Sequence, residues 1–391
     1  MDMVHESFNR LKEYCEKEGY KGWDPYDGLN SWVTQRTFLG KSSYFRLAWI
    51  QLFKRSPFNL RKLFGVGKGY NSKGLGLFVI AYCNMYRANM EREESLKKIS
   101  FLADKLVHLS SKDYSGACWG YNFDWQARAF FQPKGMPTVV ATSFVVEALF
   151  MAFDITGNQL YKDVALSSSK FVLNDLNRTY DESDNYTLSY SPKDKTQVFN
   201  AGLLGAKLLA QCYKYDGNQQ NLVEAKKICT YVCNKQNKDG SWAYSNLPYH
   251  QWIDSFHTGF NLECIYAYAT ISSDDTFQKN IDIGSKYYLE NFFLEDGTPK
   301  YYNNRIYPID IHAPAQLIVT LFKMDYFYEN EELAQKVLSW TIEHMQDKRG
   351  FFYYQKKKGI SSRIPYMRWA QSWMMYSMSY YIFKQKDNVP H

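Results

Sequence analysis

Two aspartates in this sequence stand beside aromatic residues, a setting in which carboxylates can work as acids and bases. Asp124 lies between Phe123 and Trp125, and Asp254 follows Trp252 by two residues. Hydrolysis of a glycosidic bond needs one protonated and one ionised carboxylate across the bond. Burial against tryptophan keeps one carboxyl protonated near neutral pH, so we predict Asp124 and Asp254 as a catalytic pair. The alternative for Asp254 is structural, as the cap of the helix that follows it.

Two histidines, His257 and His312, stand at the starts of consecutive apolar segments. A helix N-terminus disfavours the charged imidazolium, so both rings are expected to be neutral. A neutral imidazole can remove a proton, bind a hydroxyl or ligate a metal, and the alternative is a local hydrogen bond that holds its loop. No spacing here is diagnostic of a metal site, so we expect neither a metal nor another cofactor. His257 is the third predicted catalytic residue.

Guanidinium groups at Arg128 and Arg368 could bind a carboxylate or a phosphate in a bidentate manner. With a uronosyl substrate the chemistry would change to elimination or epimerisation, in which His257 or a tyrosine takes a proton from carbon. Flat aromatic faces could stack on sugar rings. The predicted substrate-binding residues are Trp119, Tyr121, Trp125, Arg128, Asn200, Trp242, Asp310, His312, Arg368 and Trp369.

Several of these residues recur at a regular distance along the chain. Asn200, His257, His312 and Arg368 are 55 to 57 residues apart, and each stands at the start of a long apolar segment. A repeat of that length, with two helices in each unit, indicates a ring or solenoid of helical hairpins. Amphipathic segments alternate with segments that are apolar nearly all round, the pattern of outer helices alternating with buried ones.

Six segments of each kind predict an all-α fold, an (α/α)6 barrel with the apolar helices as its inner ring. Neither a linker nor a shift in composition is evident, so residues 1–391 are predicted to form a single domain. The amphipathic segments begin near residues 3, 93, 159, 219, 275 and 331, and the apolar ones near 72, 140, 198, 257, 312 and 369.

The connections predict where the site lies. Inner helices join the next outer helix through short turns such as Asp216-Gly-Asn218. The return connections are far longer and carry aromatic turns, of which Asp239-Gly-Ser-Trp-Ala-Tyr-Ser245 is the clearest. Long loops in a compact domain are usually functional. They meet at the N-termini of the inner helices, whose free N–H groups suit a polar or anionic ligand.

Residues 41–66 interrupt the repeat with an aromatic and basic insertion. We expect this insertion to pack over the barrel rim. Contact with a membrane surface or a lipid-linked substrate is the alternative, and it is not favoured.

Composition limits the remaining classes. A net charge of +7 over 391 residues, without a nucleic-acid-binding motif, argues against a nucleic-acid partner. The apolar runs are too short for a membrane span, and the first residues lack a signal-peptide pattern. Seven cysteines, an odd number, suit reduced thiols, so a cytoplasmic protein is expected. The 33 tyrosines exceed what a core needs and suit sugar binding.

The repeat and its turns resemble those of known toroids. Alternating helices with Asp-Gly-Ser-Trp turns resemble the six-hairpin glycosidase and terpenoid-cyclase-like superfamilies. Trp119-Gly-Tyr-Asn-Phe-Asp-Trp125, Phe199-Asn-Ala-Gly-Leu-Leu204 and Asp254-Ser-Phe-His-Thr-Gly259 are similar to an uncharacterised bacterial family that occurs with polysaccharide biosynthesis genes. The acidic Asp-x-Asp-Asp proton donor of squalene cyclases is absent from the sequence, and the zinc ligands of prenyltransferases cannot be placed.

Residues and resemblance together predict a carbohydrate-active enzyme with acid–base chemistry like that of a glycoside hydrolase, working in bacterial polysaccharide metabolism. Its substrate would be a saccharide or a glycolipid, bound in an aromatic funnel. Two alternatives stay open. One is a uronosyl lyase or epimerase, and the other is a non-catalytic glycan-binding or assembly protein.

Overall fold

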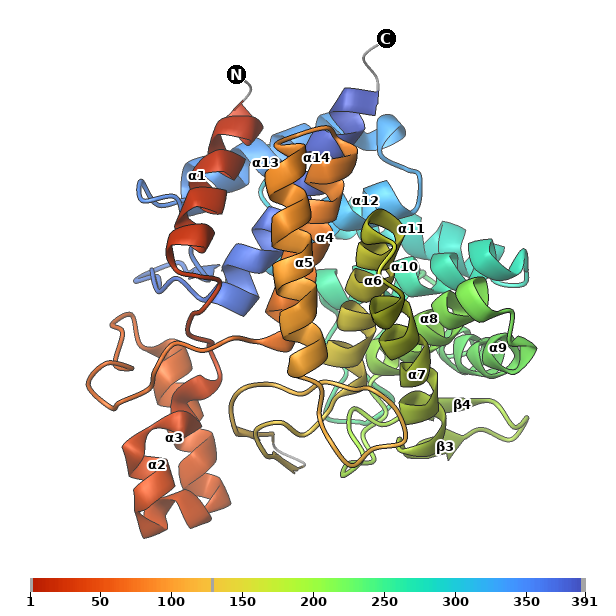
Figure 1. The fold of residues 1–391 in the computed structure, drawn as a ribbon, viewed down its shortest axis with the longest axis horizontal. Helices are drawn as coiled ribbons and strands as arrows, with labels where there is room; N and C mark the ends of the chain where they lie inside the picture. Colours follow the sequence, from red (N-terminus) through yellow and green to blue (C-terminus); the bar gives the residue numbers. More distant parts are fainter. Residues whose placement is uncertain (1–2, 128–129, 388–391) are drawn as a thin grey trace.

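Twelve long helices form an inner and an outer ring in the computed structural model, which describes residues 3–127 and 130–387. Figure 1 labels these helices. The inner ring comprises α4 (Ser72–Arg87), α6 (Val139–Thr156), α8 (Phe199–Asp216), α10 (Ser255–Ser272), α12 (His312–Lys323) and α14 (Ser372–Asp387). The outer ring comprises α1 (Met3–Lys17), α5 (Arg92–His108), α7 (Gln159–Asn174), α9 (Gln219–Cys233), α11 (Gln278–Phe292) and α13 (Glu331–Met345). The predicted (α/α)6 barrel is confirmed, with each predicted segment present as a helix.

The inner helices pack in sequence order, and α14 returns to α4 to close the ring. They are buried because they are apolar on all faces. Among the described helices α6 is long and apolar enough to cross a membrane by length and composition alone, but 72% of it is buried between its neighbours. Outer helices bury one stripe only: α5 turns Ile99, Leu102 and Leu106 inward.

The recurrent glycine turns each follow an outer helix in the chain and pack against the next outer helix. In each turn a carboxylate oxygen accepts the amide of the residue two positions on, as Asp296 does from Thr298 at 2.9 Å. The glycine then has a positive φ, and its Cα faces a backbone carbonyl so closely that an added Cβ would clash. The distances from such a Cβ are 2.3 Å for Gly240 to Ile283 O, 2.4 Å for Gly297 to Lys336 O and 2.3 Å for Gly350 to Arg10 O.

These carbonyls belong to α11, α13 and α1 respectively. Each turn therefore follows one outer helix and seats on the next one, and the last turn docks on α1 and closes the outer ring. The repeated aromatic turn that dominates the sequence is thus a packing device of the barrel.

Short antiparallel strand pairs decorate the long loops. The pairs are β1 (Trp125–Gln126) with β2 (Phe131–Gln132), β3 (Arg178–Tyr180) with β4 (Tyr186–Leu188), and β5 (Ile309–Asp310) with β6 (Gln355–Lys356).

The insertion forms a small helical lobe beside the barrel (Figure 1). It starts earlier than the predicted residue 41, because η1 (Asp27–Asn30), α2 (Trp32–Arg36) and η2 (Phe38–Lys41) precede α3 (Ser43–Arg55). Phe53 and Val66 from the lobe share a second apolar core with Tyr354 and Tyr366 of the barrel loops. This part of the lobe therefore packs against loops of the barrel.

A buried cluster of four charged side chains crosses the barrel. Lys207 Nζ on α8 lies 2.7 Å from Glu147 Oε2 on α6 and 2.5 Å from Glu263 Oε1 on α10. Lys323 at the end of α12 pairs with the same two carboxylates. Because α6 and α12 stand opposite one another in the inner ring, the Glu147–Lys323 pair spans the axis. The charges balance, so the cluster is compensated within the core.

Candidate functional site

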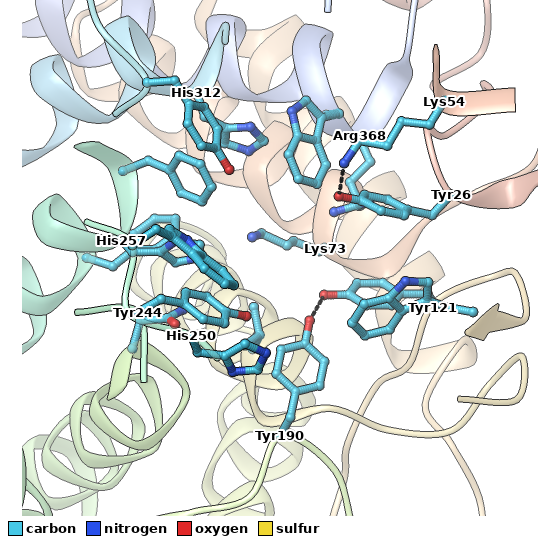
Figure 2. A pocket seen from close by; sticks show the side chains of 18 of the residues that line it. Tyr26, Lys54, Lys73, Tyr121, Tyr190, Tyr244, His250, His257, His312 and Arg368 are labelled. Atoms are coloured by element: carbon cyan, nitrogen blue, oxygen red, sulfur yellow. Dashed lines mark hydrogen bonds between the residues drawn. The ribbon is translucent and has the colours of Figure 1, made fainter. Parts of the chain in front are cut away.

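A cavity of about 590 Å³ opens where the inner helices begin (Figure 2). Five inner helices or their leading turns each contribute a polar side chain to its lining. These are Lys73 from α4, Asn200 from α8, His257 from α10, His312 from α12, and Arg368 from η4 (Met367–Gln371), the π-helical turn before α14. The repeat predicted four of these five residues to meet on the rim.

Asp254 both caps α10 and orients the cavity histidine. Its Oδ1 accepts the backbone N–H of His257 at 3.0 Å, and its Oδ2 lies 2.7 Å from His257 Nδ1. Trp252 Nε1 also donates to Oδ2, at 3.2 Å. A proton on Nδ1, donated to the carboxylate, leaves the lone pair on Nε2. The carboxylate that caps α10 is therefore also hydrogen-bonded to a histidine that lines the cavity.

His312 has a drier setting. Asp310, itself fully buried, accepts the backbone N–H of His312 and Trp369 Nε1 through Oδ1, each at 3.0 Å, and Gln355 Nε2 through Oδ2 at 2.7 Å. The His312 Nδ1 atom lies 3.4 Å from that Oδ1, longer than a good hydrogen bond. Burial lowers the pKa of His312 to about 4, so the ring is neutral at pH 7.

Arg368 enters the cavity already paired. Its Nε and Nη2 donate to the two carboxylate oxygens of Asp24 at 2.6 and 2.8 Å. The guanidinium lies 4.9 Å from the centre of the Tyr121 ring, whose hydroxyl is 2.6 Å from that of Tyr190. The bidentate pair with Asp24 offsets the positive charge of Arg368. Arg368 can still donate hydrogen bonds to a ligand, but it should bind an anion less strongly than the sequence predicted.

Lys73 is the functional candidate that the sequence analysis did not name. Its side chain points to the middle of the cavity (Figure 2), and the residue is only 5% exposed. The ammonium nitrogen lies 4.3 Å from the ring centre of Phe144 and 5.0 Å from that of Trp373. Burial, helped by nearby Arg368, holds the pKa of Lys73 well below its usual range. Lys73 lies in the first turn of α4, as Asn200 and His257 lie in the first turns of α8 and α10. This equivalent position in the repeat could have identified it from the sequence.

Aromatic rings form the walls. Tyr244 stacks on Trp252 with ring centres 4.6 Å apart, and Trp125 stands edge-on to Tyr26 at 6.0 Å. Such faces with polar edges suit the faces and hydroxyls of sugar rings. The predicted residues Tyr121, Trp125 and Trp369 are among the lining, and the unpredicted ones include Tyr26, Tyr190, Tyr244, Trp252, Phe256 and Tyr301.

Three predicted residues lie elsewhere in the structure. Asp124 faces away from the lining, since its carboxylate accepts the Lys134 amide at 2.7 Å and Gln35 Nε2 at 3.0 Å. Trp119 and Trp242 are buried in the core, where their indole N–H groups donate to the Leu106 and Val232 carbonyls. Arg128 lies outside the described residues.

The described part of the lining contains no aspartate or glutamate. Asp254 and Asp310 stand behind their histidines, and Asp24 stands behind Arg368. Within the described ranges, no three His, Cys, Asp or Glu side chains gather closely enough to hold a metal ion. The groups that can contact a ligand are therefore imidazoles, an amine and a guanidinium, and the nearby carboxylates lie behind them.

The two rings of helices and a cavity at the inner N-termini define a toroid of six helical hairpins. No protein-family model and no curated protein matches the sequence.

Solved structures share the fold at low identity. Cellobiose 2-epimerase from Bacillus thermoamylovorans aligns with a TM-score of 0.64 and 13% identity, over 81% of this chain and 88% of that one. A family 76 α-mannanase from Bacteroides thetaiotaomicron gives 0.62 and 12%, over 82% and 88%. A protein from Listeria innocua gives 0.65 and 11%, and both chains are covered in full. The likeness shows the fold.

Proposed function

We propose that this protein is an enzyme that moves a proton at a carbon atom of a saccharide, as a sugar epimerase or isomerase does. The observation that carries the proposal is the imidazole of His257, hydrogen-bonded to Asp254, beside the buried imidazole of His312, over one cavity whose described lining holds no carboxylate. Proton abstraction next to a carbonyl needs a positioned base with a pKa near neutral, and imidazole meets that need.

His257 is the proposed base. The Nδ1–H group of His257 donates a hydrogen bond to Asp254, so Nε2 keeps its lone pair and can take a proton from carbon. The carboxylate then stabilises the imidazolium that results. The same nitrogen can then return the proton to the neighbouring carbon on the same face, which isomerises the sugar. Epimerisation requires the planar intermediate to turn over, or a second acid to deliver a proton to the opposite face.

His312 is the proposed hydrogen-bond donor to the carbonyl oxygen, where negative charge develops. Its ring is neutral, and its Nδ1 has no hydrogen-bond partner among the described residues. The one ring proton can therefore stand on Nε2, and a neutral imidazole that donates in this way can polarise a carbonyl. Figure 2 shows both histidines on one side of the cavity, and they flank the ring of Phe256, whose centre lies 4.1 Å from that of His257 and 5.1 Å from that of His312.

The saccharide class of the substrate rests on the aromatic walls and on the size of the cavity, which is in the range of small-molecule sites. The likeness to an enzyme named as a cellobiose 2-epimerase supports the same class.

Glycoside hydrolysis, supported by the likeness to an α-mannanase, is the second candidate. That chemistry needs two carboxylates across the scissile bond. The predicted pair would require Asp124 to leave its contacts with Lys134 and Gln35 and turn inward. A non-catalytic glycan-binding or assembly role would use the same cavity without turnover.

We also propose a cytoplasmic setting in bacterial polysaccharide metabolism. All seven cysteines are buried and unpaired, as suits a reducing compartment.

Residues 41–66 in this proposal roof the cavity, since Gln51 and Lys54 reach its lining. Membrane contact would instead use the exposed side chains of Tyr44, Phe58 and Leu63. We expect the protein to stay in the supernatant when vesicles rich in anionic phospholipid are sedimented, and cosedimentation would favour a lipid-linked substrate.

Deuterium exchange tests the proposed proton transfer. The protein is incubated in D2O with mannose, glucose, fructose, cellobiose or glucuronate, and the sugar is followed by NMR. We expect solvent deuterium to enter at the carbon beside the carbonyl, with a rate about 100-fold or more lower in His257→Gln. His344→Gln, an exposed histidine on α13, is the matched control and should keep the full rate. Cleavage of a glycosidic bond without exchange would replace this proposal with the hydrolase.

A further inference from the structure

Lys73 is an amine buried in a polar cavity without a partner. It makes no hydrogen bond or ion pair with any residue that the structure describes, and its neighbours on three inner helices are the rings of Phe144, Phe260 and Trp373. The other lysines that are buried among the described residues, Lys12 and Lys207, lie against carboxylates. An ammonium in such a place costs free energy unless something compensates it.

The charged and titratable groups around Lys73 do not compensate it. Arg368 repels the ammonium, and Asp24, which attracts it, is already engaged in the bidentate pair with Arg368. His312 is neutral. The described lining itself contains no aspartate or glutamate that could pair with Lys73. The missing negative charge is therefore one that a ligand would supply.

We propose that the saccharide bound in this cavity carries an anionic group, a carboxylate or a phosphate ester, and that Lys73 binds it. The proposal deepens the proposed function, because it names the substrate class of the same site and presupposes a saccharide there.

Two further observations concern the ligand. Asn200, which is 4% exposed and lines the cavity, has no partner for its buried Oδ1 among the described residues, so this acceptor is left for a hydroxyl of the saccharide. Lys73 also stands in the first turn of α4, where the N-terminal end of the helix dipole favours an anion. A neutral hydroxyl would satisfy Asn200 but would leave the amine uncompensated.

Binding should be coupled to protonation. Because burial holds the pKa of the empty lysine well below its usual range, an anion that pairs with the ammonium would raise that pKa and draw a proton onto Nζ. Between the two pKa values the complex therefore takes up protons, up to one per bound ligand. Affinity for the anionic sugar falls as the pH rises above the pKa of Lys73 in the complex.

Calorimetry on the intact protein tests this proposal with D-glucuronate, D-glucose 6-phosphate, D-glucose and inorganic phosphate. We expect an anionic sugar to bind at least about 10-fold more tightly than glucose, and Lys73→Met to weaken that binding about 10- to 100-fold while glucose binding is little changed. Lys170→Met, an exposed lysine on α7, is the control and should bind like the wild type. Preference for glucuronate identifies a carboxylate, and preference for glucose 6-phosphate with competition by inorganic phosphate identifies a phosphate ester.

Proton uptake needs no variant. Titrations of the wild type in two buffers with different ionisation enthalpies, repeated at several pH values, should show protons gained when an anionic sugar binds, up to about one per ligand. Equal affinity for glucose and both anionic sugars, no binding of either anion, or anion binding without proton uptake would overturn the proposal.

The failures of the two proposals are separable. His257→Gln should keep anion binding and proton uptake while it loses deuterium exchange. Exchange on a neutral sugar that Lys73→Met leaves unchanged would remove the anionic substrate and keep the proton-transfer function. Anion binding without exchange on any sugar would do the reverse.

Discussion

His257 and His312 occupy equivalent positions on neighbouring inner helices, yet their surroundings give them different proton chemistry. The side chain of His257 is 18% exposed and is hydrogen-bonded to Asp254 through Nδ1. His312 is 2% exposed, and its ring meets the edges or faces of Trp369, Trp373 and Phe256. One ring is thus equipped to accept a proton and the other to stay neutral.

The neutral state of His312 should be visible in stability. Its pKa is about 4 in the folded protein, against about 6.5 in an unfolded chain. Between these values the unfolded chain binds a proton that the folded protein does not, so the free energy of unfolding falls as the pH drops from 6.5 to 4, by about 3 kcal/mol from this group. Urea denaturation at pH 7 and pH 4 should show His312→Gln losing less stability than the wild type by about that amount. Parallel losses would mean that His312 titrates normally.

Asp254→Asn separates capping from orientation. Asparagine is as good an N-cap as aspartate, so the free energy of unfolding should change by less than about 1 kcal/mol. An amide cannot stabilise the imidazolium, so we expect the maximal exchange rate to drop about 100-fold or more with the KM little changed. If Asp254→Asn lost much stability but kept the wild-type exchange rate, Asp254 would be a cap only.

Sequence alone brought the right residue types to the rim because the repeat marks where each inner helix begins. It placed Asn200, His257, His312 and Arg368 correctly at one end of the barrel. It could not show which way a loop side chain turns, and so it put Asp124 in the funnel although the Lys134 amide holds that carboxylate outside. It also passed over Lys73, because a lysine near the start of an apolar helix reads as a surface residue until the ring closes around it.

At the scale of elements, the Asp-Gly turns and the inner helices serve different ends. The turns attracted functional interpretation through their aromatic residues, but Trp242 and the glycines pack against outer helices. Periodicity predicted every barrel helix because inner and outer positions differ so sharply in burial. The lobe before α4 was delimited less well, since η1 and α2 are too short to show a period.

Gly297 provides a test of the turn as a packing device. Its φ is +85°, and a Cβ would lie 2.4 Å from the Lys336 carbonyl oxygen. Gly217 has a similar φ of +71° but nothing within 4 Å of such a Cβ. Alanine at Gly217 should cost about 1–2 kcal/mol for the left-handed backbone. Alanine at Gly297 should cost about 1–3 kcal/mol more, because the turn must move off α13. Equal losses in chemical denaturation would contradict the docking role.

At the scale of the whole molecule, the four-charge cluster ties α6, α8, α10 and α12 together. Lys207→Met would leave two buried carboxylates with one cation, and breaking a buried pair in this way costs about 3–5 kcal/mol. Lys227→Met removes a surface pair with Asp184 and should change stability little. Denaturant midpoints of the two variants give the comparison. A small effect at Lys207 would mean that the core relaxes and that water reaches the carboxylates.

The cluster also has a kinetic consequence. Lys207 lies about two helical turns, or about 10 Å, deeper than Asn200 along α8, and the Glu147–Lys323 pair lies across the axis below the cavity. These side chains close the barrel axis below the cavity, so a polymer cannot pass through the ring. Whatever binds must leave through the mouth by which the next molecule arrives. Product leaves and substrate enters through the same opening of the same cavity, so accumulated product should compete directly with substrate for the site.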